Sequence, residues 1–564
     1  MMLNIRPATT NCNNTYIWML LLIAVVIIAN IQIYWLQVLV EDDYLYGVYY
    51  WQYSQRTILQ HILFQGAYLP NRLLCWIAGN VNVYLARTVV LVGIMLPCSG
   101  LIFNILRRLR YPLPVAFCAA SLIWLFPGQN EIPLFVNGSY LAEALLIMSV
   151  SFYAAIKYLD NNNKNNWIWF AFTLVTMFWA LNVSEQVVAG AFAICICLLC
   201  WKRFDKKVCI LSGAMILLVV HHAYFNILHG GRLISRVEPL SLEKLSRVLR
   251  SFLNYYLPFP GMRVNIDATS GMMLFYSIFS FGLFTLIIKY AVTIFICKND
   301  VKMSDRVSTV YEHLWRLAFP IVMFLAPLLI MVKAPYFTPR HALFPALGFY
   351  LLLAYITYEL IGNFYYVNTG LCTVFVIAII IKHYTHIYTL YSPCNADHMV
   401  ISRFMTKQQF PIKSQIVVSG ANVRTDSYHK FSTGYFIYTL KRKDITGVIG
   451  EDFNLNDPFK IAPRIINSKM NSLNLTDPLF IYRKTENGIH QLTYLLQWKQ
   501  NTINSDFAIY RVDKYTGKIV LYDVGKGWAS YLEKKKELAA REGQPTDIMW
   551  GADLTESDKK RVGI

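Results

Sequence analysis

The chain has few charged residues for its length. Asp, Glu, Lys and Arg make up only 15% of its 564 residues, whereas soluble proteins usually carry about 25%. Hydrophobic residues make up 56%. This composition argues against one large soluble domain. It predicts a polytopic membrane protein whose long apolar runs fall within residues 1 to about 390.

Cysteine is missing after Cys394, so no disulfide framework is expected in the C-terminal part. Cys195, Cys197 and Cys200 share one apolar run, where they are expected to be small packing residues rather than a metal cluster. The N-terminus lacks the pattern of a cleavable signal peptide, because its first apolar run is too long. A retained first helix is predicted instead.

Basic residues outnumber acidic ones by 52 to 33, which gives a net charge of +19. Many of them lie in short loops between apolar runs, as the positive-inside rule requires. No basic helix or zinc-ligand spacing supports nucleic acid binding, so no nucleic acid partner is expected. The predicted surrounding is a lipid bilayer.

The apolar runs predict about eleven spanning helices, a mainly α fold. Their approximate bounds are 17–40, 82–105, 112–127, 134–156, 167–183, 186–201, 208–226, 271–297, 314–332, 343–360 and 366–388. The basic loops lie after the second, fourth, sixth and eighth runs, so they share the cytoplasmic side. An odd helix count then places residues 41–43 and the chain after the last helix outside.

Residues 391–564 are predicted to form a small β-rich α+β soluble domain. Short alternating runs punctuated by Gly, Asn and Asp are typical of strands. They lie at 415–418, 434–440, 478–482, 507–510 and 518–522, and a charged helix is expected at 530–541. No internal repeat is visible.

Three consecutive acids, Glu41, Asp42 and Asp43, follow the first apolar run. Carboxylates this close repel each other, so one of them can have a raised pKa. Such a carboxylate beside a membrane surface suits a general base that takes a proton from a hydroxyl. The alternative is three solvated loop acids just past a helix end.

Further outward clusters carry candidate substrate contacts. Arg72 suits a bidentate phosphate contact, or it snorkels to the membrane interface. Glu185 lies in a tight turn near the bilayer, where charges are functional hypotheses by default. Glu131 is a weaker candidate because it also suits an ordinary loop acid.

A basic, proline-stiffened segment at 333–341 contains Lys333, Arg340 and His341. Positive charge gathered at the outer surface suits a phosphate leaving group. His221 and His222, at the outer end of the run at 208–226, are candidates for the same site. Adjacent histidines on a helix point two ways, so a shared metal is not favoured.

Together, the acids at 41–43, the segment from Tyr68 to Arg72 and the Pro339-Arg340-His341 motif resemble the GT-C class of polytopic membrane glycosyltransferases. Within that class, the chain looks most like the bacterial O-antigen (serotype-converting) glucosyltransferases. The resemblance covers the whole chain in topology, and individual motifs only at these short segments. The C-terminal region matches nothing in particular.

The resemblance implies a transmembrane catalytic domain at 1–390 and a periplasmic domain at 391–564, in the bacterial inner membrane. It implies transfer of a sugar, with glucose as the preferred assignment, from a polyprenyl-phosphate donor to a hydroxyl of a lipid-linked glycan acceptor. Asp42 or Asp43 would be the base. Arg340, with Arg72 and Lys333, would hold the leaving phosphate. Some members of the class use a divalent cation and others do not, so the metal stays open.

Other functions fit parts of the pattern. A glycan polymerase or ligase would share outward Arg and His residues but would usually lack acids directly after the first helix. A lipid or glycan transporter would be expected to show internal repeats and charges within its helices. In a third alternative, the helices only anchor a working C-terminal domain.

Overall fold

The computed structural model describes residues 12–31, 42–49, 69–124, 136–160, 166–224, 303–332, 342–361, 395–419 and 429–450, the strands between 479 and 526, and isolated residues elsewhere. Contacts within the chain divide it into two compact units. Unit 1 contains Met1–Trp35, Gln60–Leu74 and Tyr84–Thr389. Unit 2 contains Leu36–Leu59, Cys75–Val83 and Leu390–Ile564.

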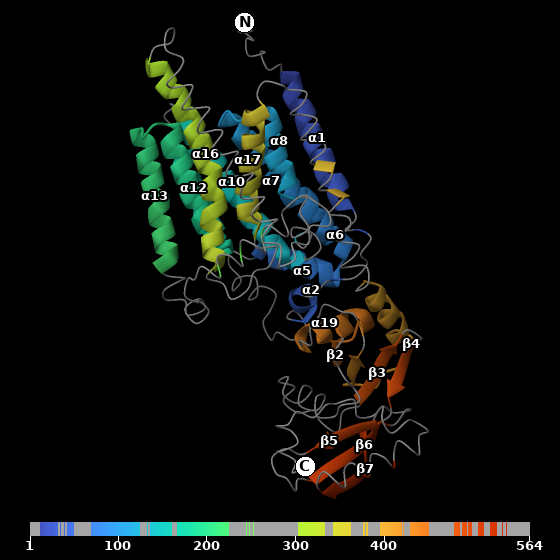
Figure 1. The fold of residues 1–564 in the computed structure, drawn as a ribbon. Helices are drawn as coiled ribbons and strands as arrows, with labels where there is room; N and C mark the ends of the chain where they lie inside the picture. Colours follow the sequence, from blue (N-terminus) through green and yellow to red (C-terminus); the bar gives the residue numbers. More distant parts are fainter. Residues whose placement is uncertain are drawn as a thin grey trace. The chain divides into compact units, whose positions relative to one another are not determined.

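Unit 1 is a bundle of apolar helices (Figure 1). In chain order these are α1 (Cys12–Asn30), α6 (Val83–Thr88) continued by the π-helical η4 (Val89–Met95) and α7 (Leu96–Arg108), α8 (Leu113–Leu122), η6 (Val136–Ser139) with α10 (Tyr140–Asp160), α11 (Asn166–Val183), α12 (Gln186–Trp201), α13 (Lys206–His222), α16 (Met303–Val332) and α17 (Leu343–Ile361). A further helix, α5 (Leu69–Asn80), belongs to unit 1 in its first half.

Within the described residues, four helical segments are long and apolar enough to cross a membrane. They are Val83–Arg108, Val136–Asp160, Asn166–Val183 and Leu343–Leu360. Several helices also expose large apolar side chains, among them Val175 and Leu217. Lipid tails can cover such side chains, whereas water cannot do so favourably. These features support the predicted membrane protein; the count of about eleven helices stays a prediction.

Helices α10, α11 and α12 are consecutive and pack side by side. The Asn166 amide donates to the Tyr158 carbonyl (2.7 Å), and the Ser151 hydroxyl donates to the Thr173 carbonyl (2.8 Å). These two bonds show that α10 and α11 are antiparallel. A turn at Ser184 and Glu185 reverses the chain again, so α12 runs parallel to α10.

Gly190 sets how closely α10 and α12 approach. A Cβ atom at this position would collide with the sulfur of Met148. A larger residue here would require the Met148 side chain to move. Residues 148 and 190 therefore lie at the same level of the two parallel helices.

Unit 2 contains two sheets. The first has the strand order β2-β1-β3-β4, from β1 (Gln415–Ser419), β2 (Thr446–Gly450), β3 (Leu479–Thr485) and β4 (Gly488–Leu492). Strand β1 pairs in parallel with both β2 and β3, whereas β3 and β4 form an antiparallel hairpin. The second sheet is antiparallel, with β5 (Tyr494–Trp498), β6 (Asp506–Val512) and β7 (Ile519–Lys526).

A helix, α19 (His429–Leu440), lies between β1 and β2 in the sequence and packs on β2. The strand predicted at 434–440 is therefore wrong. Its aromatic and β-branched residues favour a strand locally, but tertiary packing decides the outcome. Tyr435, Phe436 and Ile437 are consecutive and all buried, and the Thr433 hydroxyl exchanges hydrogen bonds with Gly447 of β2.

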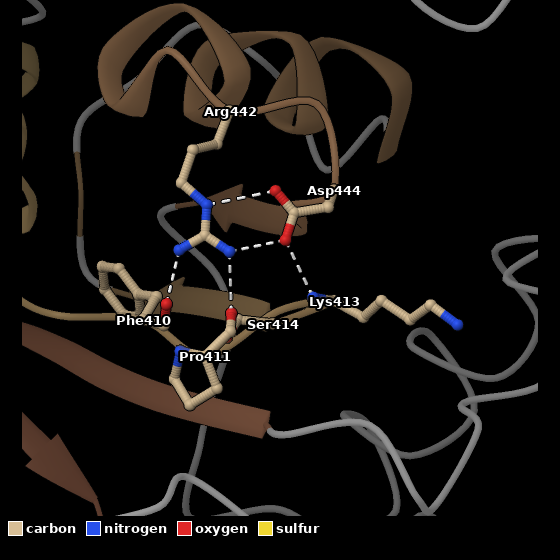
Figure 2. A network of polar contacts seen from close by, with 6 residues as sticks. All are labelled: Phe410, Pro411, Lys413, Ser414, Arg442 and Asp444. Atoms are coloured by element: carbon tan, nitrogen blue, oxygen red, sulfur yellow. Dashed lines mark hydrogen bonds and ion pairs between the residues drawn. The ribbon is translucent and has the colours of Figure 1, made fainter.

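An arginine fork ties together the segments that lead into β1 and β2 (Figure 2). Arg442 makes two hydrogen bonds to the Asp444 carboxylate and donates to the carbonyls of Phe410 and Pro411. Asp444 also accepts from the Lys413 amide (2.9 Å). The Arg442 guanidinium lowers the pKa of Asp444 to about 2. The fork thus fixes the two parallel strands at their beginnings.

Other predicted elements are present with changed bounds. The strands expected at 415–418, 478–482, 507–510 and 518–522 correspond to β1, β3, β6 and β7. The first helix was predicted over 17–40, but α1 ends at Asn30. There the Asn30 side chain donates to the Val26 carbonyl (2.8 Å), a local bond of the kind that competes with helix continuation. The helix expected at 271–297 lies outside the described residues.

Candidate active site

The acidic segment after the first helix forms a short helical turn in unit 2. Asp42, Asp43 and Tyr44 make up α2 (Asp42–Tyr44), and the π-helical η2 (Leu45–Tyr49) continues it. Asp43 and Tyr44 are completely buried. Glu41 and the side chain of Asp42 lie outside the described part of the chain. Asp43 is therefore a carboxylate removed from solvent, unlike a solvated loop acid.

Tyr44 anchors this turn in an aromatic cluster. Its hydroxyl lies 3.2 Å from Nδ1 of His398, and its ring contacts the rings of His398, Tyr435 and Tyr438. Gly434 permits close packing, because a Cβ there would collide with the Tyr44 carbonyl oxygen. α2 is thus fixed against α19, and Asp43 with it.

His398 is the buried partner in this cluster and lies in the helical segment 395–405. Burial lowers its pKa to about 4, although the charge of the adjacent Asp397 acts in the opposite direction. Asp397 is itself paired with Lys484 (2.8 Å), and Tyr435 donates to the His398 carbonyl (2.8 Å). A neutral imidazole can accept a hydrogen bond from the Tyr44 hydroxyl.

In unit 1, Asn71 and the predicted site residue Arg72 contact the polar turn at residues 136–139. The Asn71 amide donates to the carbonyls of Val136 and Asn137 and to the Ser139 hydroxyl, each at 3.0 Å. The half-buried Arg72 donates to Oδ1 of Asn137 at 2.6 Å. Arg72, which is predicted to bind phosphate, is thus held by the polar turn η6 that opens α10. This contact orients the guanidinium.

Glu143 is a polar residue of this region that sequence analysis missed. It lies one turn into α10 and is buried, and within the described residues its Oε2 has no hydrogen-bond partner. An acid isolated in an apolar helix is a functional candidate by default. The signal was present in the sequence, as the one acidic residue in the run 134–156.

The register of the helices places Gln186 at about the same height along the bundle as Glu143. The pairs 151–173 and 158–166 put Glu143 level with Leu181, near the end of α11. Gln186 opens α12 directly after the following turn, and its Oε1 is also buried without a hydrogen-bond partner among the described residues. A polar layer thus crosses α10 and α12 about one turn from the contact between Gly190 and Met148.

The remaining described candidates lie at helix ends of unit 1. Glu185 is exposed in the turn between α11 and α12. His221 is exposed at the end of α13, with its ring 6.3 Å from that of Phe178, whereas the neighbouring His222 is buried. The two histidines therefore have different surroundings and do not form a pair of metal ligands.

Five predicted site residues remain outside the described part of the chain: Glu41, Glu131, Lys333, Arg340 and His341. Carboxylates such as Asp42 and Asp43 are the ligand type that Mg²⁺ or Mn²⁺ prefers. The described ranges contain no group of three or more His, Cys, Asp or Glu residues placed to hold a metal ion. The metal question stays open.

No family model and no curated protein sequence matches the chain. Solved structures of an archaeal oligosaccharyltransferase from Archaeoglobus fulgidus are similar to it at low scores. The enzyme AglB with an inhibitory peptide and a dolichol-phosphate has a TM-score of 0.40 at 8% identity, covering 83% of this chain and 70% of that one. The complex with Zn and sulfate has 0.41 at 9%, covering 83% and 68%. The apo form has 0.37 at 9%, covering 85% and 69%.

The described geometry offers two kinds of chemistry. In unit 2, a fixed, buried carboxylate in α2 suits proton abstraction from a hydroxyl. In unit 1, an oriented guanidinium suits a phosphate oxygen, since charge-assisted hydrogen bonds of this kind are strong.

Proposed function

We propose that the chain is a membrane glycosyltransferase. It moves a hexose, with glucose as the preferred assignment, from a polyprenyl-phosphate donor to a hydroxyl of a lipid-linked glycan such as O-antigen. The reaction takes place on the outer side of a bacterial inner membrane, with residues 1–390 as the catalytic domain and 391–564 as a periplasmic domain. The observation that carries this proposal is the buried Asp43, held in place by the packing of Tyr44.

In this proposal, the acceptor hydroxyl attacks the anomeric carbon of the donor sugar. Its proton passes to the carboxylate of Asp43 or Asp42 as the new glycosidic bond forms. The bond between the anomeric carbon and the phosphate oxygen breaks, and polyprenyl phosphate leaves. Arg72 binds the leaving phosphate together with Arg340, Lys333 and His341. Glu41 tunes the acids by like-charge repulsion, and Glu131, Glu185, His221 and His222 contact the substrates.

The test is neutralisation of each acid in turn. Asp42→Asn and Asp43→Asn are assayed in membrane vesicles supplied with labelled polyprenyl-phosphate glucose and a lipid-linked glycan. Loss of a general base typically lowers a rate by about 10²–10⁴-fold, and at least one variant is expected to show it. Asp205→Asn is the matched control, because Asp205 is an exposed acid whose side chain makes no cap hydrogen bond.

Full transfer by both variants would refute the catalytic role of these acids. The mass added to the acceptor separates the proposed activity from a glycan polymerase or ligase. A single hexose per acceptor supports the glucosyltransferase. Addition of whole repeat units would identify a polymerase or ligase instead.

A transporter is the second candidate, and Glu143 is the observation that favours it. Transporters place acids inside membrane helices, where they carry protons or bind substrate. If the chain is a transporter, Glu143→Gln in proteoliposomes abolishes movement of a fluorescent polyprenyl-phosphate sugar across the bilayer, while Asp43→Asn leaves it unchanged. If it is a transferase, wild type and Glu143→Gln both show movement only at the level of empty liposomes, and the substitution affects only sugar transfer.

A further inference from the structure

A cleft of about 400 Å³ opens at the other end of α10, away from the polar layer that contains Glu143. It lies where α7, α10 and α12 end and where the first half of α16 passes. Its lining is formed by four basic residues, two acidic ones and two tryptophans. These are Arg108, Arg110, Lys202, Arg203, Asp160, Glu312, Trp201 and Trp315.

Cations exceed carboxylates in this lining. Asp160 is shared by two of them, with Lys202 at 2.9 Å and Arg108 at 3.6 Å. Glu312 is likewise shared, between Arg110 at 3.5 Å and Arg316 at 3.4 Å. Each carboxylate therefore balances only part of the positive charge around it, and the cleft keeps a positive surplus.

Two of the cations, Arg110 and Arg203, lie in chain turns that follow helices. Arg110 follows α7 and Arg203 follows α12, and both have positive φ angles, 63° and 51°. This left-handed conformation ends a helix and reverses the chain. Both are exposed, Arg110 with 72% of its side chain accessible. The helix dipole alone attracts basic residues to helix C-termini. It does not explain why these basic residues line a cleft together with two tryptophans.

We propose that this cleft binds the phosphate headgroup of an anionic phospholipid in the cytoplasmic leaflet. The basic loops place this end of the bundle in the cytoplasm. Basic pockets between membrane helices on that side are suited to anionic headgroups. Trp201 and Trp315 also line the cleft, and indole rings are favoured at the membrane interface. This lipid is distinct from the donor and acceptor of the proposed reaction.

The experiment uses native mass spectrometry of the full chain in detergent, titrated with phosphatidylglycerol or phosphatidylcholine. Wild type is expected to bind one phosphatidylglycerol more tightly than phosphatidylcholine. Arg110→Gln with Arg203→Gln is expected to weaken that first binding roughly 30-fold, the loss that two basic residues near an anionic surface predict. Arg110→Lys with Arg203→Lys should keep most of it.

Lys206→Gln with Lys207→Gln is the matched control. It removes the same charge at the start of α13, from two lysines that do not line the cleft. Equal losses in this control and in the arginine pair would overturn the proposal, as would equal affinity for the two lipids. Displacement of the lipid by an equal concentration of glycerol 3-phosphate would show a soluble phosphate ligand and also overturn it. Arg110→Gln alone, an exposed change, repeats the test if the pair fails to fold.

Discussion

At the scale of single residues, burial changes the titration of His398 in unit 2. Its pKa falls from 6.5 to about 4 on folding. Between these values the unfolded chain binds a proton that the folded chain does not, so stability rises with pH. Acidification from pH 6.5 towards 4 should therefore destabilise unit 2, by on the order of 3 kcal/mol.

The measurement is thermal unfolding of the purified protein at a series of pH values from 7 to about 4.5, an interval chosen around the ordinary histidine pKa. His398→Gln should be less stable at neutral pH and should lose most of the acid sensitivity. Equal acid sensitivity in wild type and variant would assign the effect to other groups.

Two acids show how far residue-level prediction from sequence extends. The run of three acids marked Asp43 as a candidate, but its complete burial accompanies the packing of α2 on α19, which is distant in sequence. Glu143 was overlooked because the apolar residues around it dominate the run. A search for lone charges inside predicted spans would have found it.

At the scale of elements, α2 is positioned by one glycine in α19. Gly434→Ala adds a methyl group that collides with the carbonyl oxygen of Tyr44, a backbone atom that cannot rotate away. Overpacking of this kind costs typically about 1–3 kcal/mol. The variant is expected to have a lower melting temperature and faster proteolysis within residues 42–49.

Gly213→Ala provides the control, because nothing lies within 4 Å of a Cβ at that position. There the exchange should be neutral or stabilising, since alanine favours a helix by up to about 1 kcal/mol over glycine. If Gly434→Ala melts like wild type, then α2 does not depend on this contact.

Sequence patterns predicted helices better than strands here. Apolar runs located α10, α11, α12 and α17 within a few residues, because a spanning helix must be long and apolar. Strands β2, β4 and β5 were not predicted, and α19 was mistaken for a strand. These short elements are decided by pairing partners such as β1 and β3, which no local pattern reveals.

At the scale of the whole molecule, the alternation of basic loops predicts that the chain ends outside the cytoplasm. A reporter fused after Ile564 that is active only in the cytoplasm should stay silent, whereas one active only outside should give signal. The expected contrast comes from the positive-inside rule. A cytoplasmic signal would reverse the topology and put the acids of α2 on the wrong side for a flipped lipid donor.

The contact between Tyr44 and His398 can form only late in synthesis of the chain. The two residues are 354 positions apart. Synthesis at about 5–20 residues per second separates them by roughly 20–70 s. Throughout that interval α2 exists without the cluster that fixes it, while the helices of unit 1 are being made. A ribosome that stops early therefore leaves membrane helices with an unfinished acidic turn. Asp43 can be fixed in place only after His398 and α19 have been synthesised.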